Sequence, residues 1–160
     1  TEDVLVEHCT YGKVHAALTL GSECIHAKNI TIRNCKVDTN TPVLHLKMRP
    51  DTYQLYEDIT VEGITGSCGS IISMAPWTQF FNMKGSNAQP FAVVRDVTIS
   101  DVQVHCKQFG VMRGNPHDQV SHITFRNIRA TAEEPDLKTP YKDITVENVV
   151  VNGKPLKLSQ

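Results

Sequence analysis

The sequence predicts an all-β protein whose strands stack as a solenoid, the parallel β-helix. A short segment of alternating apolar residues returns six times along the chain. A second apolar strand follows the first four copies at a nearly constant distance. Repeats of this length that are built from strands rather than helices are typical of solenoids, because each unit buries its apolar face only against its neighbours.

The six copies open with a polar residue and close with a short hydrophobic one. Their starts are separated by 26, 29, 38, 26 and 21 residues. We expect a single β-helix domain over residues 1–160, forming the C-terminal part of a longer solenoid. The copies are Asp3–Cys9, Asn29–Cys35, Asp58–Ile64, Asp96–Val102, His122–Ile128 and Asp143–Val149.

Alternating apolar residues with many β-branched side chains indicate strands that are buried on one side. Strands of successive copies lie about 4.8 Å apart in a parallel stack, so equivalent apolar residues form inward columns. The first column is Val4, Ile30, Ile59, Val97, Ile123 and Ile144, and the second is Val6, Ile32, Val61, Ile99, Phe125 and Val146. Cys9 and Cys35 occupy the closing apolar position, and we expect both to be buried as small hydrophobic residues.

A sharp bend is expected just before each closing residue. Asn34, Asn127 and Asn148 stand there in three copies, with Gly63 and Asp101 at the equivalent places in two others. Asn, Gly and Asp tolerate left-handed backbone, so the chain can change direction at this position.

The second strands are expected where short apolar runs follow the repeats. These runs are Ala16–Leu20, Val43–Lys47, Ser70–Met74 and Phe109–Arg113, which begin 13, 14, 12 and 13 residues after their repeat starts. Leucine-rich repeats, the competing solenoid, would need a Leu-x-x-Leu-x-Leu consensus that this chain lacks. Pro76–Pro90 is too long for a turn and predicts an excursion on one face. After Ile128 the apolar pattern is lost in Thr131–Asp136, so we expect the stack to thin there.

The composition is that of a globular protein, with 40% hydrophobic residues and a formal net charge of −1. Bulk charge implies neither nucleic acid nor a membrane surface as a partner, and no apolar run approaches the roughly 20 residues of a membrane-spanning helix. Because the cysteines and histidines lack Cys-x-x-Cys or His-x-x-x-His spacing, we expect no metal ion and no cofactor. The repeats assign no role to Cys24, Cys68 or Cys106.

The first repeat begins at Asp3, with no capping unit before it. A solenoid needs atypical units at its ends, and an uncovered strand edge pairs readily with another chain. We therefore expect either a preceding N-terminal part or self-association through this open end.

Aligning the second strands by their 26-residue offset predicts which side chains face outward. The outward set contains a cationic stripe made of His15, His45, Lys47 and Arg49. Gly21 is level with Lys47 in this alignment and leaves room beside the lysine side chain. Such groups suit an anionic ligand such as a carboxylate-bearing sugar. An ordinary solvated β-face is the alternative interpretation. Trp77, Phe80 and Phe81 likewise either stack on a sugar or anchor the excursion onto the solenoid.

Three segments resemble the polygalacturonase-type family 28 glycoside hydrolases: Val14–Glu23, Asn29–Cys35 and Leu46-Lys47. The resemblance covers essentially the whole chain, and Leu46–Thr52 and Ala75–Phe81 are similar to bacterial members. It implies a right-handed parallel β-helix that cleaves α-galacturonide bonds of pectic polysaccharide with inversion. We accordingly expect an acidic polysaccharide as the partner and a secreted or periplasmic location.

The resemblance also suggests roles for individual residues. His15 falls on the histidine of the family's Gly-His-Gly pattern, where it would support the catalytic acid or a sugar hydroxyl. Lys47 falls on the lysine of Arg-Ile-Lys, where it would bind a uronate carboxylate. We expect His45 and Arg49 to bind substrate beside it, because they belong to the same outward cationic stripe. The chain departs from these patterns at Val14 and Ala16, which replace glycines, and at His45, which replaces the arginine.

Inverting hydrolysis needs two carboxyl groups roughly 6.5–9.5 Å apart. The family supplies them from Asn-Thr-Asp and Asp-Asp patterns before the histidine, and neither pattern precedes His15 here. Glu23, Asp51 and Asp118 are the other candidates, and no two of them share one outward strand. We expect a pectin-degrading glycosidase whose catalytic aspartates lie outside this chain, with weak or no activity in the chain alone. A non-catalytic binder of acidic polysaccharide and a purely structural solenoid are the alternatives.

Overall fold

The computed structural model describes residues 1–79, 81–85 and 87–160, and all regular elements in these ranges are strands. They form one 13-stranded sheet in which, over the described residues, only β11 and β12 pair antiparallel. The strands are β1 (Glu2–Glu7), β2 (Thr10–Tyr11), β3 (Leu18–Leu20), β4 (His26–Arg33), β5 (Lys36–Asp38), β6 (Pro42–Met48), β7 (Gln54–Glu62), β8 (Thr65–Pro76), β9 (Ala92–Met112), β10 (Gln119–Lys138), β11 (Ile144–Val151), β12 (Lys154–Pro155) and β13 (Leu158–Ser159). The expected all-β, largely parallel architecture is confirmed.

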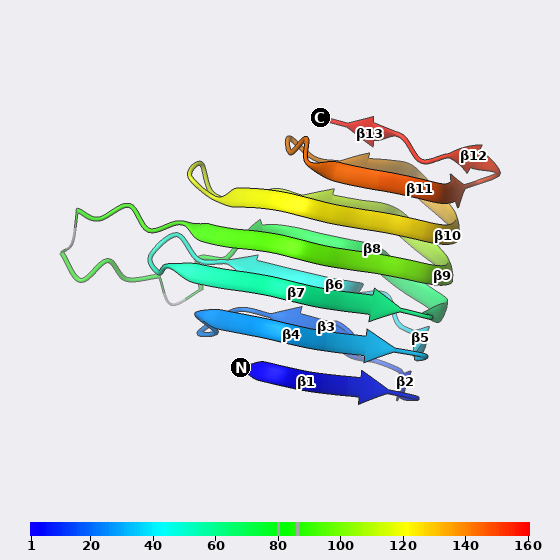
Figure 1. Cartoon of the computed structure of the whole chain (residues 1–160), viewed down its shortest axis with the longest axis horizontal. Helices are drawn as coiled ribbons and strands as arrows, with labels where there is room; N and C mark the ends of the chain where they lie inside the picture. Colours follow the sequence, from blue (N-terminus) through cyan, green and yellow to red (C-terminus); the bar gives the residue numbers. More distant parts are fainter. Residues whose placement is uncertain (80, 86) are drawn as a thin grey trace.

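The strands stack in parallel runs from the N-terminus at one end to the C-terminus at the other (Figure 1). The front run is β1-β4-β7-β9-β10-β11, and β3-β6-β8 forms a second run behind it. β9 joins the two, because its first half pairs with β7 and its second half pairs with β8. Each repeat of the sequence therefore contributes one layer to the stack.

The register of the front run matches the predicted apolar columns. Val4 pairs with Ile30, and Ile123 pairs with both Val97 and Ile144. Burial follows the columns only in the middle of the stack, where Ile30, Ile59 and Phe125 are at most 2% exposed. Residues at the two ends of the stack depart from the expectation.

The columns open to solvent at their ends. Val146 is 36% exposed because β12, the outer neighbour of β11, pairs only with Val150 and Val151. The expected burial of Cys9 is wrong, whereas Cys35 is buried as predicted. Cys9 is exposed because β2, which follows it, pairs only with β5 in the described chain.

The predicted left-handed backbone before the closing residue is confirmed. Asn34, Asp101, Asn127, Asn148 and Gly63 all have φ between 51° and 63°. Five of the six opening polar residues share this conformation, which was not predicted from the sequence: Asp3, Asn29, Asp58, Asp96 and His122 have φ between 51° and 56°. Each of these strands therefore contains one residue with left-handed backbone, which changes the direction of the side chains that precede it.

The second strands form where they were expected, but the predicted thinning after Ile128 is wrong. β10 continues to Lys138, and Leu137 is fully buried between Gly110 of β9 and Leu158 of β13. The inward side chains just before it are Ala130 and Ala132. Alanine gives a weak alternating signal, so the strand was not evident from the apolar pattern.

The segment between β8 and β9 leaves the stack and projects to one side, as the sequence predicted (Figure 1). Backbone contacts hold its beginning in place. Trp77 N–H donates to the Met48 carbonyl of β6 at 2.8 Å, and Phe81 N–H donates to the Thr78 carbonyl at 3.0 Å. Phe80 lies outside the described residues.

Candidate functional site

Three side chains meet on β6 and just beyond β8: His45, Lys47 and Trp77, here called the Trp77 cluster. Lys47 Nζ lies 3.8 Å from the centre of the Trp77 ring, and the His45 ring meets Trp77 edge-on at 6.1 Å between centroids. An ammonium group over an indole face is an attractive cation–π arrangement. The structure therefore places a positive charge, an imidazole and an aromatic ring side by side.

Local sequence explains how β6 presents these groups. Leu44 and Leu46 point into the core and are fully buried, so His45 and Lys47 face the other way. Gly21 makes room for the lysine, as the offset alignment predicted. A Cβ on Gly21 would lie 2.4 Å from Lys47 Cβ, and φ at Gly21 is 132°, which disfavours any other residue.

The environment of the His45 imidazole favours its neutral form at pH 7. Burial lowers its pKa below the ordinary value of 6.5, and the positive charge of Lys47 lowers it further. A neutral imidazole offers one donor and one acceptor, so His45 contributes hydrogen bonds to the cluster while Lys47 contributes the charge.

The titration of His45 tests this arrangement. We expect the midpoint of the His45 ring resonances in an NMR pH titration to lie below 6.5. In Lys47→Met the midpoint is expected to rise towards 6.5, because the neighbouring positive charge is removed. An unchanged His45 midpoint in the variant would show that the two side chains are not coupled.

Arg49 does not belong to the exposed stripe, and that part of the prediction is wrong. Arg49 is 7% exposed. Its guanidinium donates to both carboxylate oxygens of Asp51, from Nε to Oδ1 at 2.7 Å and from Nη2 to Oδ2 at 2.6 Å. It also donates to the Gln79 carbonyl at 2.9 Å. The arginine is used to attach the excursion to the stack, because Asp51 in turn accepts from Asn82 N–H at 3.0 Å.

Asp51 is poorly suited to donate a proton in catalysis. Its hydrogen bonds from Arg49 lower the pKa of the carboxyl to about 2, against an ordinary value of 3.8. A general acid that works near neutral pH needs a raised pKa instead. Asp51 therefore acts as a structural carboxylate.

His15 lies apart from the Trp77 cluster. It precedes β3, is exposed, and lines an open hollow of about 750 Å³ with residues 12–14 and 38–40. Lys47 is not among the residues that line this hollow. Of the four predicted stripe residues, the structure brings together His45 and Lys47 and leaves His15 and Arg49 elsewhere.

The contacts of Trp77 support its predicted role as an anchor of the excursion. Its backbone contact and its ring contacts attach the excursion to β6. Its Nε1 is buried and has no hydrogen-bond partner among the described residues. An unpaired buried donor is costly, so its retention needs an explanation beyond packing.

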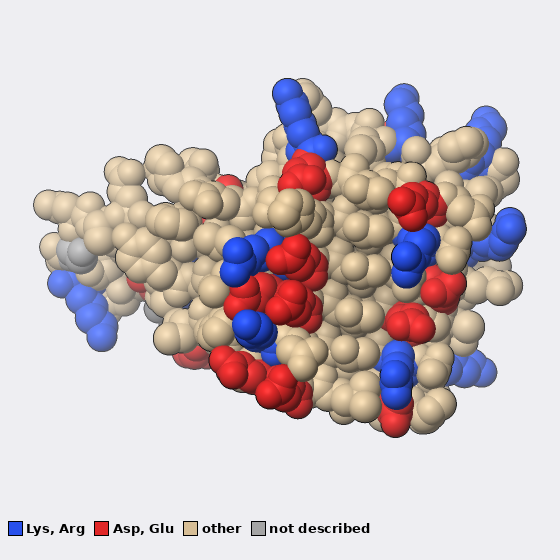
Figure 2. All heavy atoms as spheres, viewed as in Figure 1, with Lys and Arg blue, Asp and Glu red and all other residues tan. Residues whose placement is uncertain are grey.

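Sequence reasoning missed two ladders of alternating charge on the front face (Figure 2). One lies just before the opening residues of the repeats, and the other lies four residues after them. Aligning the copies would have found both, since the sign alternates from layer to layer. The ladders are Glu2, Lys28, Glu57 and Arg95, and Glu7, Arg33, Glu62, Arg126 and Glu147, the second interrupted by Ser100.

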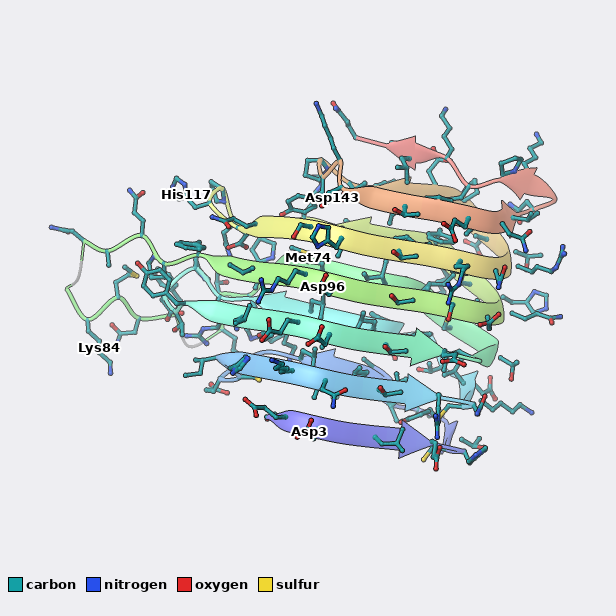
Figure 3. The ribbon with its side chains drawn as sticks, viewed as in Figure 1. Asp3, Met74, Lys84, Asp96, His117 and Asp143 are labelled. Atoms are coloured by element: carbon teal, nitrogen blue, oxygen red, sulfur yellow. The ribbon has the colours of Figure 1, made fainter. Side chains whose placement is uncertain are left out.

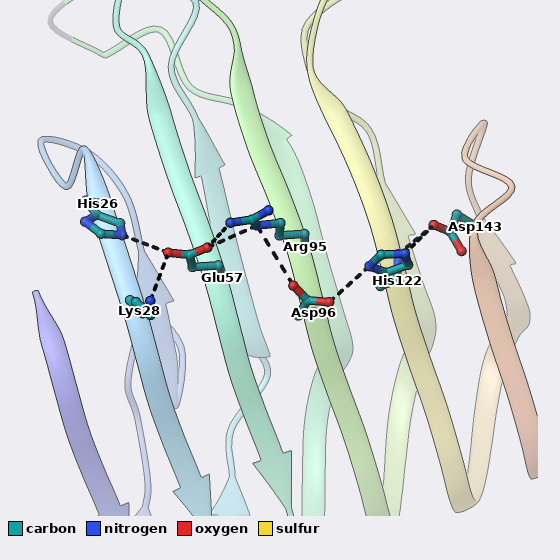
Figure 4. Close-up of polar contacts among 7 residues, drawn as sticks. All are labelled: His26, Lys28, Glu57, Arg95, Asp96, His122 and Asp143. Atoms are coloured by element: carbon teal, nitrogen blue, oxygen red, sulfur yellow. Dashed lines mark hydrogen bonds and ion pairs between the residues drawn. The ribbon is translucent and has the colours of Figure 1, made fainter.

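Glu57 is the centre of the first ladder (Figure 4). It accepts from Arg95 Nε at 3.0 Å, lies 3.3 Å from His26 Nε2, and lies 3.8 Å from Lys28 Nζ. The hydrogen bonds from Arg95, and then from His26, lower the pKa of this carboxyl. These opposite charges stabilise the stacking of layers and leave Glu57 ionised, so it is not a proton donor.

A second group of polar side chains continues along the same face. His122 lies 3.1 Å from an oxygen of Asp96 and 3.7 Å from an oxygen of Asp143 (Figure 4). Figure 3 shows Asp3 on β1, Asp96 on β9 and Asp143 just before β11, each at the opening position of its repeat. No group of three or more His, Cys, Asp or Glu side chains in the described residues is arranged to hold a metal ion.

Comparisons with known proteins assign the chain to no family. No protein-family model matches the chain, and searches of curated proteins and of solved structures also find no match. Among the residues that the structure describes, no helix is long and apolar enough to cross a membrane.

Proposed function

We propose that the chain is a right-handed parallel β-helix of the polygalacturonase-like class, and that it binds an acidic polysaccharide such as galacturonan. The in-register parallel stacking and the repeated left-handed bends support the β-helix. The resemblance of its motifs to family 28 glycoside hydrolases supports the class. The Trp77 cluster supports the ligand.

One observation carries the proposed ligand: Lys47 presents an ammonium group beside the Trp77 ring on the outward side of β6. A uronate sugar combines a carboxylate with an apolar ring face, and these two features match an ammonium group and an indole. Neutral His45 adds a hydrogen-bonding group next to the lysine. In the hydrolase proposal, Lys47 holds the uronate and His15 supports the acid or a hydroxyl.

Binding without hydrolysis is the second candidate, and the state of two carboxylates, Asp51 and Glu57, favours it for this chain alone. Asp51 is engaged by Arg49, and Glu57 is engaged by Arg95 and His26. Both have lowered pKa values, so neither suits the role of the general acid. The proposal therefore assigns the substrate-binding side of the reaction to this chain and names no catalytic carboxylate in it.

Lys47→Met tests the proposed ligand. We expect the affinity for polygalacturonate oligosaccharides, measured by calorimetry at low salt, to fall about tenfold, because one charge-assisted contact is lost. The methionine keeps most of the apolar stem, so Trp77 retains a packing partner. Lys154→Met, which removes the same charge from an exposed residue of β12, is expected to leave the affinity unchanged.

Two outcomes decide between the candidates. Equal affinities for the Lys47 and Lys154 variants, with unfolding temperatures like that of the parent, would contradict binding at the Trp77 cluster. Release of reducing ends from polygalacturonate, abolished by His15→Ala and unaffected by His105→Ala, would establish hydrolysis by the chain alone. Binding without release of reducing ends supports the second candidate.

A further inference from the structure

Two cysteines that the repeats left without a role lie directly opposite each other. Cys68 of β8 pairs with Cys106 of β9 in parallel register. The residues are 4% and 9% exposed, and both side chains are free thiols. Residues directly paired in neighbouring parallel strands point to the same side of the sheet, so the two thiols share one environment.

This placement satisfies the condition on Cα separation for a cross-link. Neighbouring strands are about 4.8 Å apart, which lies inside the roughly 4.4–6.8 Å range of Cα separations found in disulfides. We infer that Cys68 and Cys106 form an oxidisable thiol pair that closes to a disulfide joining β8 to β9. The disulfide would tie together the two strands between which the excursion with Trp77 leaves the stack.

One member of the pair is positioned to react first. Cys106 lines a surface hollow of about 230 Å³ together with His105, Glu133 and Asn152, and it is the more exposed of the two cysteines, at 9% against 4%. A hydrogen bond from the Cys68 thiol lowers the pKa of Cys106, whereas the same contact and burial raise the pKa of Cys68. The thiolate is the reactive form, so attack begins at Cys106.

The reaction balances with a small disulfide, such as oxidised glutathione, as the oxidant. The Cys106 thiolate attacks one sulfur of the oxidant and forms a mixed disulfide, and one small thiolate leaves. Cys68 then loses its proton and attacks the Cys106 sulfur, which releases the second small thiolate. Two electrons pass to the oxidant, and two thiol protons are taken up by the departing thiolates.

The other stacked cysteines differ in their contacts. Cys9 and Cys35 are also neighbours, since Cys9 N–H donates to Cys35 Sγ at 3.4 Å. Cys9 and Cys35 each donate to the carbonyl two residues earlier, Cys9 to Glu7 at 3.4 Å and Cys35 to Arg33 at 3.1 Å, whereas Cys106 donates to the Thr131 carbonyl of β10 at 3.6 Å. Burial raises the pKa of Cys35, which slows its oxidation.

The experiment uses the full chain with Cys9→Ser, Cys24→Ser and Cys35→Ser, which leaves only Cys68 and Cys106. After incubation with oxidised glutathione we expect two thiols to disappear, the mass to fall by two hydrogens, and one cross-linked peptide to contain both cysteines. Dithiothreitol is expected to restore both thiols. The oxidised form is expected to unfold roughly 10 °C higher, because a long loop is closed.

Adding Cys68→Ser to this background provides the matched control, which is expected to stop at the mixed disulfide on Cys106. The inference is overturned if both thiols persist, if each takes up one glutathione, or if the product is a cross-linked dimer. It is also overturned if oxidation of the parent chain yields only a Cys9–Cys35 peptide.

Discussion

Replacing Asp51 with asparagine is expected to lower the free energy of unfolding by about 3 kcal/mol at pH 7, measured by urea denaturation. The side chains of Arg49 and Asp51 are 8% and 4% exposed, so the variant leaves a buried guanidinium without its counter-charge. The loss extends to the excursion, because Asp51 also accepts from Asn82 N–H. We expect faster proteolysis between β8 and β9 in the variant.

The pH dependence of stability gives a second signature of the same pair. The pKa of Asp51 is about 2 in the folded chain and near the ordinary 3.8 when unfolded. A lowered carboxyl pKa contributes stability above about pH 4 that is lost as the pH falls from 3.8 towards 2. Asp51→Asn lacks this contribution, so its stability is expected to fall less steeply across that window.

Asp136→Asn is the matched control, because the Asp136 side chain makes no hydrogen bond or ion pair within the described residues. We expect its unfolding free energy to stay within about 0.5 kcal/mol of the parent value. Equal effects of the two substitutions, or identical acid profiles for Asp51→Asn and the parent, would contradict a stabilising role for the Arg49–Asp51 pair.

Phe125→Ala is expected to cost about 4 kcal/mol of unfolding free energy, the largest effect in the front run. Phe125 is fully buried, and its ring lies 5.6 Å from the Phe109 ring across the core. Truncation removes this aromatic contact and leaves a cavity between the two runs of strands. Thermal and urea unfolding at pH 7 both measure the loss.

Val146→Ala tests whether the loss of unfolding free energy depends on how deeply a residue is buried or only on its place in the predicted apolar column. Val146 pairs directly with Phe125 and belongs to the same predicted column, but it is 36% exposed. We expect a loss below about 1 kcal/mol. A Val146 effect as large as that of Phe125 would mean that the end of the stack is covered in solution.

The repeat predicted the registers of the front run because its signal is local. Side chains alternate along a strand with a period of two, and copies of one pattern align when they stack. The bends followed from residue types in the same way, since Asn34, Gly63 and Asp101 tolerate positive φ. The left-handed opening residues were missed because an aspartate or histidine at a strand start is also explained by solubility alone.

Other expectations were wrong because the burial of a residue also depends on the strand that lies on its outer side in the stack. Cys9 and Val146 fit apolar columns, yet no described strand covers their outer side. The tail of β10 was missed because its inward residues are small, although Leu137 is fully buried by β9 and β13. Burial is a property of the neighbouring layers, which alternation along one strand does not report.

The candidate site shows the same division. By itself the sequence determined that Lys47 and His45 face outward and that Gly21 leaves room beside the lysine, because these follow from strand parity and offset. Only the tertiary structure decided that Arg49 is buried against Asp51 and Gln79, and that Trp77 lies under the Lys47 ammonium. The reason is physical: the charge that a side chain offers to a ligand depends on the partners that the folded excursion brings back to β6.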